Sequence, residues 1–312
     1  MAAAGLAVAA AAQGYPAKTI RIVIAYPNGG GSDFTARPIA QKLTERWGQS
    51  VIVESRPGAA AMIGTDFVAK SAPDGYTLLL SASSEVSMNV VLFRKMSYDP
   101  VRDLQPVTLV GTTPPILLAH PSLPVKSVKE MVALARAKPG ALNYASIGTG
   151  SPQHFAGELM KTTFRIDIVH VPYKGAAPAL IDMIGGHVPI GLIAPTVALP
   201  HVQSGRLRAL GVTSAQRSGS MPDIPTIAEQ GAPGFDIVQW YALWLPAKTP
   251  KDVADKIQGE VVRIVQSQDY RQRQQEVATD IVGSSAEALG TFQKAEIEKF
   301  RKIATAAGIK PE

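Results

Sequence analysis

The 312-residue chain alternates β-strand patterns with helical patterns along most of its length. Short apolar or β-branched runs such as Thr19–Tyr26, Val51–Glu54 and Leu142–Ala145 are each followed by a stretch with helical spacing of apolar residues. Repeated strand–helix units form mostly parallel sheets, because a parallel connection needs a crossover that a helix supplies. The sequence therefore predicts an α/β protein with helices on both faces of its sheets.

The strand–helix units fall into two series, and the chain is longer than one hydrophobic core usually serves. We predict two doubly wound lobes. Residues 14–111 and 236–312 form lobe 1, and residues 112–235 form lobe 2. The segments that join them, Gly111–Pro114 and Gly231–Phe235, contain Gly and Pro, and we expect the hinge there.

Composition excludes several kinds of site. With 46% hydrophobic and 18% charged residues the chain can bury a large core, so disorder is not expected. The absence of cysteine excludes disulfides, thiolate metal sites, cysteine nucleophiles and a lipid-modified cysteine. The net charge is +6, but Lys and Arg are scattered, so nucleic acid is not an expected partner.

The five histidines show no metal-ligand spacing, and we expect no metal and no cofactor. Apart from His154, they are expected at the surface or at strand ends.

Residues 1–13 are mostly small and apolar and end in an Ala-rich stretch before Gln13. This resembles the end of a secretory signal peptide that lacks its basic start, and a disordered tail is the alternative. No later segment reaches the roughly 20 apolar residues that a membrane helix needs. We expect a soluble, exported, monomeric protein without a lipid anchor.

A glycine-rich loop follows the first predicted strand. It comprises Tyr26, Pro27, Asn28, Gly29, Gly30, Gly31, Ser32 and Asp33, and the next helix is predicted from Ser32. Glycines let backbone N–H groups approach a ligand, and a helix N-terminus favours anions. The loop is neither a P-loop nor a G-x-G-x-x-G motif. It is therefore either an anion site or a plain flexible turn.

A second loop of the same kind joins the strand Leu142–Ala145 to a helix. It reads Ser146, Ile147, Gly148, Thr149, Gly150, Ser151, Pro152, Gln153 and His154. Ser151 fits an N-cap and Pro152 the first helical position. Two such helix starts, one in each half of the chain, could together hold one carboxylate.

A serine hydrolase is the main enzymatic alternative, because Ser151, His154 and Asp182 are present. Pro152 follows the serine, however, so the pattern is not G-x-S-x-G. A serine followed by proline at a helix start is usually a cap, and we expect no catalytic residue.

Taken together, the loops and their surroundings resemble the Bug family, the periplasmic solute-binding proteins of tripartite tricarboxylate transporters (TctC-like). The similarity runs from about Tyr15 to the C-terminus, and it depends on the order and spacing of short segments. Besides the two loops, these segments are Tyr15-Pro16, Glu54–Gly58, Ala72–Thr77, Tyr98–Pro100, Val171–Gly175, Gly205–Leu210 and Met221–Thr226.

The resemblance implies a two-lobed Venus-flytrap fold of the type II periplasmic binding proteins, with a carboxylate held between the lobes. It also implies the ligand-binding residues and, as partners, the membrane subunits of a transporter. On the first side these residues are Tyr26, Pro27, Asn28, Gly29, Gly30, Ser32, Asp33, Ser81, Ser83 and Ser84. On the second side they are Ser146, Gly148, Thr149, Gly150, Gln153 and His154. Further residues implied near the ligand are Tyr173, Ala194, Pro195 and Tyr241.

Some positions depart from the family pattern. Asn28 stands where proline is frequent, Pro38 lies within the first helix, and Pro189 replaces a frequent aspartate. Ala194 and Pro195 replace a more polar stretch. The ligand is therefore expected to be a mono- or dicarboxylate, aliphatic or aromatic. A hydrolase on the same scaffold, or a sensory ligand-binding subunit, remains the alternative function.

Overall fold

The computed structural model describes residues 14–311, so the predicted signal-peptide remnant at 1–13 lies outside the described residues. The chain divides into two compact units, each assembled from separate segments. Unit 1 comprises the chain up to Gly111, Trp240–Gln272 and Ile281–Ile297; unit 2 comprises Thr112–Gln239, Arg273–Asp280 and the chain from Glu298. That these units are lobes that move relative to each other about hinges at Gly111–Pro114 and Gly231–Phe235 stays a prediction.

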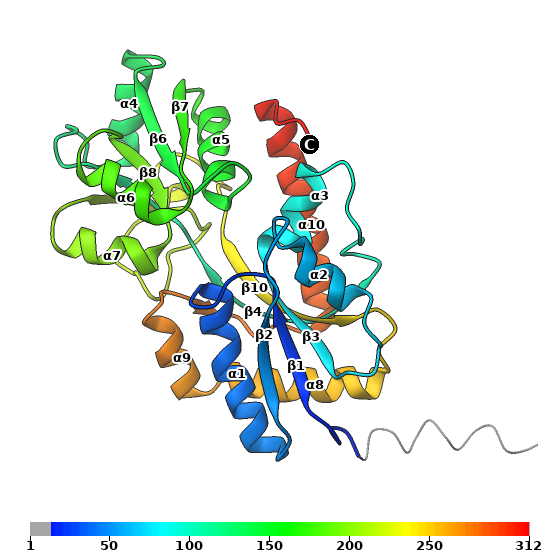
Figure 1. Cartoon of the computed structure of the whole chain (residues 1–312). Coiled ribbons are helices and arrows are strands. Elements are labelled where there is room, and N and C mark those ends of the chain that lie inside the picture. The colour runs from blue at the N-terminus through cyan, green and yellow to red at the C-terminus, as the bar shows by residue number, and fades with distance from the viewer. Residues whose placement is uncertain (1–13, 312) are drawn as a thin grey trace, which may run out of the picture. The chain divides into compact units, whose positions relative to one another are not determined.

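The first sheet has six strands in the order β11-β4-β10-β3-β1-β2. Strand β1 pairs in parallel with β2 and β3, and β10 pairs antiparallel to β3 (Figure 1). The strands are β1 (Ile20–Ile24), β2 (Val51–Ser55), β3 (Thr77–Ala82), β4 (Leu104–Thr113), β10 (Gln239–Pro246) and β11 (Asp280–Ile281). The accompanying helices are α1 (Gly31–Trp47), α2 (Met62–Ala69), η1 (Ser84–Met88, π-helical), α3 (Asn89–Leu92), α8 (Lys251–Val265), α9 (Gln268–Gln275) and α10 (Ala286–Ala307).

Alternate residues of β1 build the core of unit 1. Ile20, Ile22 and Ile24 are wholly buried and share one cluster with Ile39 of α1 and Ile257 of α8. The period of two in the strand and the helical spacing in α1 and α8 bring these side chains to one face of the sheet. This packing fixes the carboxyl end of β1, from which the first glycine-rich loop leaves.

The second sheet has five strands in the order β7-β6-β8-β5-β9. Strand β6 is parallel to β7 and β8, whereas β5 is antiparallel to β8 and β9. The strands are β5 (Ile116–Ala119), β6 (Leu142–Ser146), β7 (Ile168–Pro172), β8 (Ile190–Ile193) and β9 (Arg208–Val212). The helices are α4 (Val128–Ala137), α5 (Pro152–Phe164), α6 (Ala176–Ile184), α7 (Pro195–Gln203) and η2 (Ala228–Gln230).

The two faces of the second sheet are covered by different helices. Ala145 of β6 belongs to a buried cluster with Met183 of α6 and Ala198 of α7. The preceding residue, Tyr144, points to the other face, where a Cβ added to Gly157 of α5 would lie 2.2 Å from its ring. Glycine at 157 therefore allows α5 to approach β6 closely.

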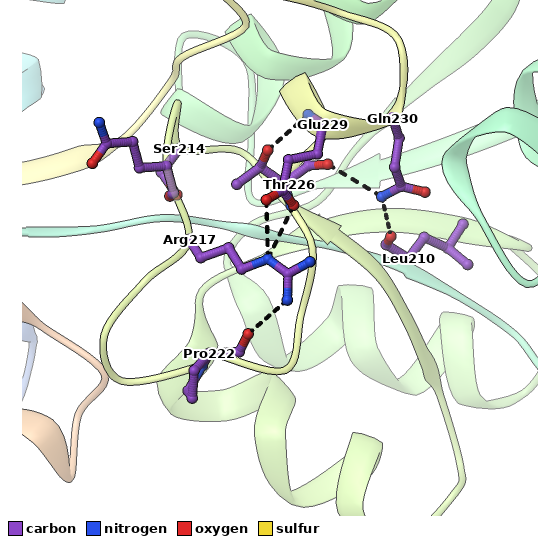
Figure 2. A network of polar contacts seen from close by, with 8 residues as sticks. Leu210, Ser214, Arg217, Pro222, Thr226, Glu229 and Gln230 are labelled. Carbon is purple, nitrogen blue, oxygen red and sulfur yellow. Dashed lines mark hydrogen bonds and ion pairs between the residues drawn. The ribbon is translucent and has the colours of Figure 1, made fainter.

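A capping box fastens the segment after β9 (Figure 2). The Thr226 hydroxyl accepts a hydrogen bond from the Glu229 amide at 2.9 Å, and the Glu229 carboxylate accepts one from the Thr226 amide at 2.8 Å. Arg217 pairs with the same carboxylate at 3.0 Å, and the Gln230 side chain donates to the Leu210 carbonyl at 2.8 Å. These contacts hold the loop against β9.

Several element boundaries differ from those expected. The segment Gly111–Thr113, predicted as part of a joining segment between the lobes, continues β4. Helix α1 begins at Gly31, one residue before the predicted Ser32. The helices η1, α3, α7 and α9 were not predicted. With five and four residues, η1 and α3 are too short for a periodic signal, whereas α7 contains Pro200 and α9 is almost entirely polar. Among the described residues, no helix has the length and apolar composition needed to cross a bilayer.

Candidate functional site

The first loop, Tyr26–Asp33, leaves the carboxyl end of β1 and turns into α1 with Gly30 as N-cap. No described residue accepts a hydrogen bond from the backbone N–H groups of Gly30, Gly31, Ser32 and Asp33. The first N–H groups of a helix have no acceptor within the helix, and the helix dipole adds positive charge there. The first loop therefore offers a set of amides suited to an anion.

Asp33 closes this loop from inside. Its carboxylate accepts the Gly29 amide at 3.0 Å and pairs with Arg37 one helical turn later at 2.8 Å. Burial acts to raise the pKa of Asp33, but the hydrogen bonds from Arg37 and Gly29 outweigh it and hold the pKa below its usual value. The Gly29 amide is thus already hydrogen-bonded to Asp33, and Arg37 balances the negative charge of that carboxylate.

Tyr241 of β10 lies over the first turn of α1. A Cβ added to Gly31 would come within 1.9 Å of the Tyr241 hydroxyl oxygen, so only glycine leaves room for the ring. No described residue forms a hydrogen bond with that hydroxyl. Burial and the nearby Glu85 raise the pKa of Tyr241 to about 12, so the hydroxyl stays protonated. The structure therefore places the predicted neighbour Tyr241 beside the amides of the first loop.

The three serines near the end of β3 have different environments. Ser81 lies within the strand, is wholly buried and accepts the Trp244 indole N–H at 2.8 Å. Ser83 is also wholly buried, and its hydroxyl has no partner among the described residues. Ser84 is half-buried and lies in η1. Of the three serines, only Ser83 and Ser84 therefore follow the end of β3.

The second loop, Ser146–Ser151, is closed by its own side chains. The Gly148 amide donates to the Ser146 hydroxyl at 3.1 Å, and the Gly150 amide donates to His154 Nδ1 at 3.1 Å. The Ser151 hydroxyl accepts from the His154 amide at 3.2 Å and donates to the Gly148 carbonyl at 2.7 Å. Most amides that the sequence suggested for a ligand are therefore already paired.

The second loop retains fewer unpaired backbone N–H donors for a ligand than the first loop does. Among the described residues, no group accepts a hydrogen bond from the amides of Thr149 and Gln153. Likewise, no group there donates one to the buried Oε1 of Gln153. Because His154 Nδ1 accepts the Gly150 N–H, the neutral ring carries its proton on Nε2. The second loop thus offers two amides, an amide side chain and one imidazole N–H.

His170 supports this loop, although the sequence suggested a surface or strand-end residue. Its Nε2 lies 2.7 Å from the Ser146 hydroxyl, and its ring stacks on His154 at 4.3 Å and on Tyr144 at 4.8 Å. Burial, and then the neighbouring His154, lower the pKa of His170 to about 4, and burial also lowers that of His154. Both rings are therefore neutral at neutral pH. The spacing of 16 residues between them gave no sequence signal.

Three predicted residues share the carboxyl edge of the second sheet with this loop. Because β6, β7 and β8 are parallel, Tyr173 after β7 and Ala194 after β8 come to the same edge as Ser146. Tyr173 donates its hydroxyl to Asp182 at 2.6 Å, and Pro195 is buried as the first residue of α7. The position of these three residues agrees with a ligand-binding site at this edge of the sheet. The Tyr173 hydroxyl, however, already has a hydrogen-bond partner within unit 2.

A serine nucleophile is not assembled at Ser151. Its hydroxyl is engaged as the cap of α5, and the nearby His154 contributes its backbone amide to that hydroxyl, while its Nδ1 accepts from Gly150. A general base would have to contact the hydroxyl through a ring nitrogen. The geometry is that of a helix cap.

Two features of unit 1 were missed from the sequence. Glu85 in η1 is wholly buried, and its Oε2 lies 3.1 Å from the Tyr26 hydroxyl oxygen. Ala59, Ala60 and Ala61, between β2 and α2, have φ angles of 46°, 52° and 69°, a region that L-residues other than glycine rarely adopt. The preceding Pro57-Gly58 was the only cue for such a turn.

The family model described as the tripartite tricarboxylate transporter family receptor matches residues 35–309. The chain belongs to this family. The protein BugT of Bordetella pertussis is 35% identical to the receptor over 312 residues, which cover 99% of this chain and 95% of BugT. The resemblance to the Bug family expected from the sequence is therefore confirmed.

Solved structures of similar proteins support the same family assignment. A Rhodopseudomonas palustris protein, Rpa4515, determined with adipate, is 33% identical, with a TM-score of 0.83, and the match covers 96% of this chain and 100% of that one. MatC from the same organism, with bound malate, is 28% identical, with a TM-score of 0.76 and coverages of 93% and 99%. These relatives and the two α/β sheets confirm the predicted fold class, the two-lobed type II binding-protein fold.

Proposed function

We propose that this receptor captures a small carboxylate with the first loop of unit 1 and the second loop of unit 2, and passes it to a tripartite transporter in the membrane. The observation that supports this most strongly is the row of unpaired amides at Gly30–Asp33 at the start of α1, beside the unpartnered Tyr241 hydroxyl. Relatives across nearly the whole chain were solved with adipate and malate, both dicarboxylates.

The arrangement favours a carboxylate over other ligands. The donors are backbone amides, hydroxyls and one neutral imidazole, and Arg37, which contacts the first loop, is paired with Asp33. Such a site can satisfy the oxygens of a carboxylate without a cationic side chain. The buried, unpartnered Ser83 hydroxyl and Gln153 carbonyl oxygen suit further polar contacts or ordered waters.

We propose that the protein binds its ligand without chemical change, as an exported monomer that acts in the periplasm. The cap role of Ser151 and the burial of Ser146 support binding over hydrolysis. The matching family is that of transporter receptors, which supports uptake over sensing.

Calorimetry tests the ligand class. The purified receptor should bind at least one of adipate, malate and an aromatic dicarboxylate, and it should not bind a neutral sugar such as glucose. Ligand at 100 times its dissociation constant should add about 2.7 kcal/mol to the free energy of unfolding, which thermal unfolding can measure. Tight binding of the sugar, with none of the carboxylates bound, would contradict the proposal.

A further inference from the structure

Glu85 is a buried carboxyl group whose surroundings contain no cation. It is 0% exposed and lies in η1, the π-helical turn that directly follows β3. The groups that face it are the hydroxyls of Tyr26 and Tyr241, the backbone amides of Ala82 and of Glu85 itself, and Tyr98, whose hydroxyl donates to the Glu85 carbonyl at 2.6 Å. Among the described residues, no Lys, Arg or His forms an ion pair with it.

The hydrogen bonds of Glu85 decide where its proton can reside. Oε1 accepts the Ala82 amide at 2.7 Å, so that oxygen is occupied by a donor. Oε2 lies 3.1 Å from the Tyr26 hydroxyl oxygen. A protonated Glu85 therefore carries its proton on Oε2 and can donate it to Tyr26.

The direction of this one hydrogen bond controls what Tyr26 can offer to a ligand. A tyrosine hydroxyl has a single proton. If Glu85 is ionised, Tyr26 must donate to it and turns only lone pairs to the outside. If Glu85 is protonated, it donates to Tyr26, as the neighbouring Ser84 side chain can also do, and the Tyr26 proton can turn toward a carboxylate at the first loop.

We propose that Glu85 acts as a positioning residue that stays protonated and directs the Tyr26 hydroxyl proton toward the ligand carboxylate, so that ionising Glu85 weakens binding. This inference rests on the proposed function of the first loop. Burial supports it, because it raises the pKa of Glu85 to about 8 and thereby keeps the group neutral at neutral pH. Burial likewise raises the pKa of Tyr26 well above its ordinary value, so Tyr26 remains a hydroxyl.

The pH dependence follows from the protonated fraction. With a pKa of about 8, Glu85 is mostly protonated at pH 7 and only about one tenth protonated at pH 9. The apparent dissociation constant scales inversely with the competent fraction, so affinity should fall by about tenfold between these values. The ligand carboxylates are ionised throughout this range and add no pH dependence of their own.

Glu85→Gln is the matched control, because its carboxamide can accept the Ala82 amide and donate to Tyr26 at every pH. Adipate and malate serve as probes in calorimetry at pH 7 and pH 9. Wild type should lose about tenfold in affinity, whereas Glu85→Gln should bind equally at both pH values and within about twofold of wild type at pH 7. Tyr26→Phe should bind more weakly at pH 7 and lose the pH dependence.

A second measurement separates this proposal from the proposed function. The infrared difference spectrum of ligand-free wild type minus Glu85→Gln should contain a protonated carboxyl band at pH 7 that disappears above pH 9. Absence of that band at pH 7, or an equal fall in affinity for Glu85→Gln, overturns the role of Glu85. If neither carboxylate binds at any pH while the band is present, the proposed ligand class fails instead.

Discussion

Replacing Gly148 with valine is expected to weaken carboxylate binding by about tenfold or more while the chain remains folded. Gly148 has φ of 132°, which a β-branched residue strongly resists, and a Cβ there would lie 3.3 Å from the Tyr173 carbonyl oxygen. The turn would have to change, and with it the position of the Thr149 amide. Loss of one hydrogen bond to a charged group costs about 1.5–3 kcal/mol, or roughly ten- to 150-fold in affinity.

Gly205→Val is the control for backbone strain alone. Gly205 also has a positive φ, 71°, and lies in unit 2 outside both expected hinge segments, and a Cβ there meets nothing within 4 Å. Calorimetry and thermal unfolding of both variants separate lost binding from lost stability. Normal ligand binding by Gly148→Val would show that the second loop has been assigned wrongly.

Gly31→Val is the corresponding change in unit 1 and should also reduce affinity by about tenfold or more. Its side chain would collide with the Tyr241 hydroxyl and ring, which lie 1.9 Å and 2.7 Å from the added Cβ. The ring would be displaced, and the new methyl groups would cover the free amides of Gly31 and Ser32. Those amides are the donors on which binding at the first loop depends.

The control here is Gly259→Val on α8, where an added Cβ has open space. Both variants place valine in a helix of unit 1, so the intrinsic helix penalty is similar. Tyr241→Phe separates the hydroxyl from the bulk of the ring and should lose less affinity than Gly31→Val. Equal affinity of Gly31→Val and Gly259→Val for adipate and malate would remove Tyr241 and the start of α1 from the site.

Much of the fold could be predicted, because strand and helix patterns are local. The runs around Ile22 and Tyr144 and the cap at Ser151 carry their signals within a few residues, and the structure confirms them. The antiparallel placement of β5 and β10 could not be predicted. It depends on pairings between distant segments, such as Tyr241 with Ala82, for which the period of apolar residues carries no information.

The candidate site was predicted as two loops, but not how their polar groups are used. Sequence alone treated the glycine amides as free, whereas Asp33 takes that of Gly29 and His154 takes that of Gly150. Glu85 gave no signal, because a lone glutamate is usually solvated and only the tertiary structure buries it. Which polar groups hydrogen-bond to each other is decided by tertiary packing, and the local sequence pattern does not reveal it.

The most direct test of the central claim is an amide NMR titration of the isotope-labelled receptor with adipate and with malate. The account predicts that the largest shifts occur at two places in the sequence at once, the amides of Gly30–Asp33 and those of Thr149 and Gln153. Shifts confined to one of the two loops, or centred on residues outside both, would contradict binding by both loops.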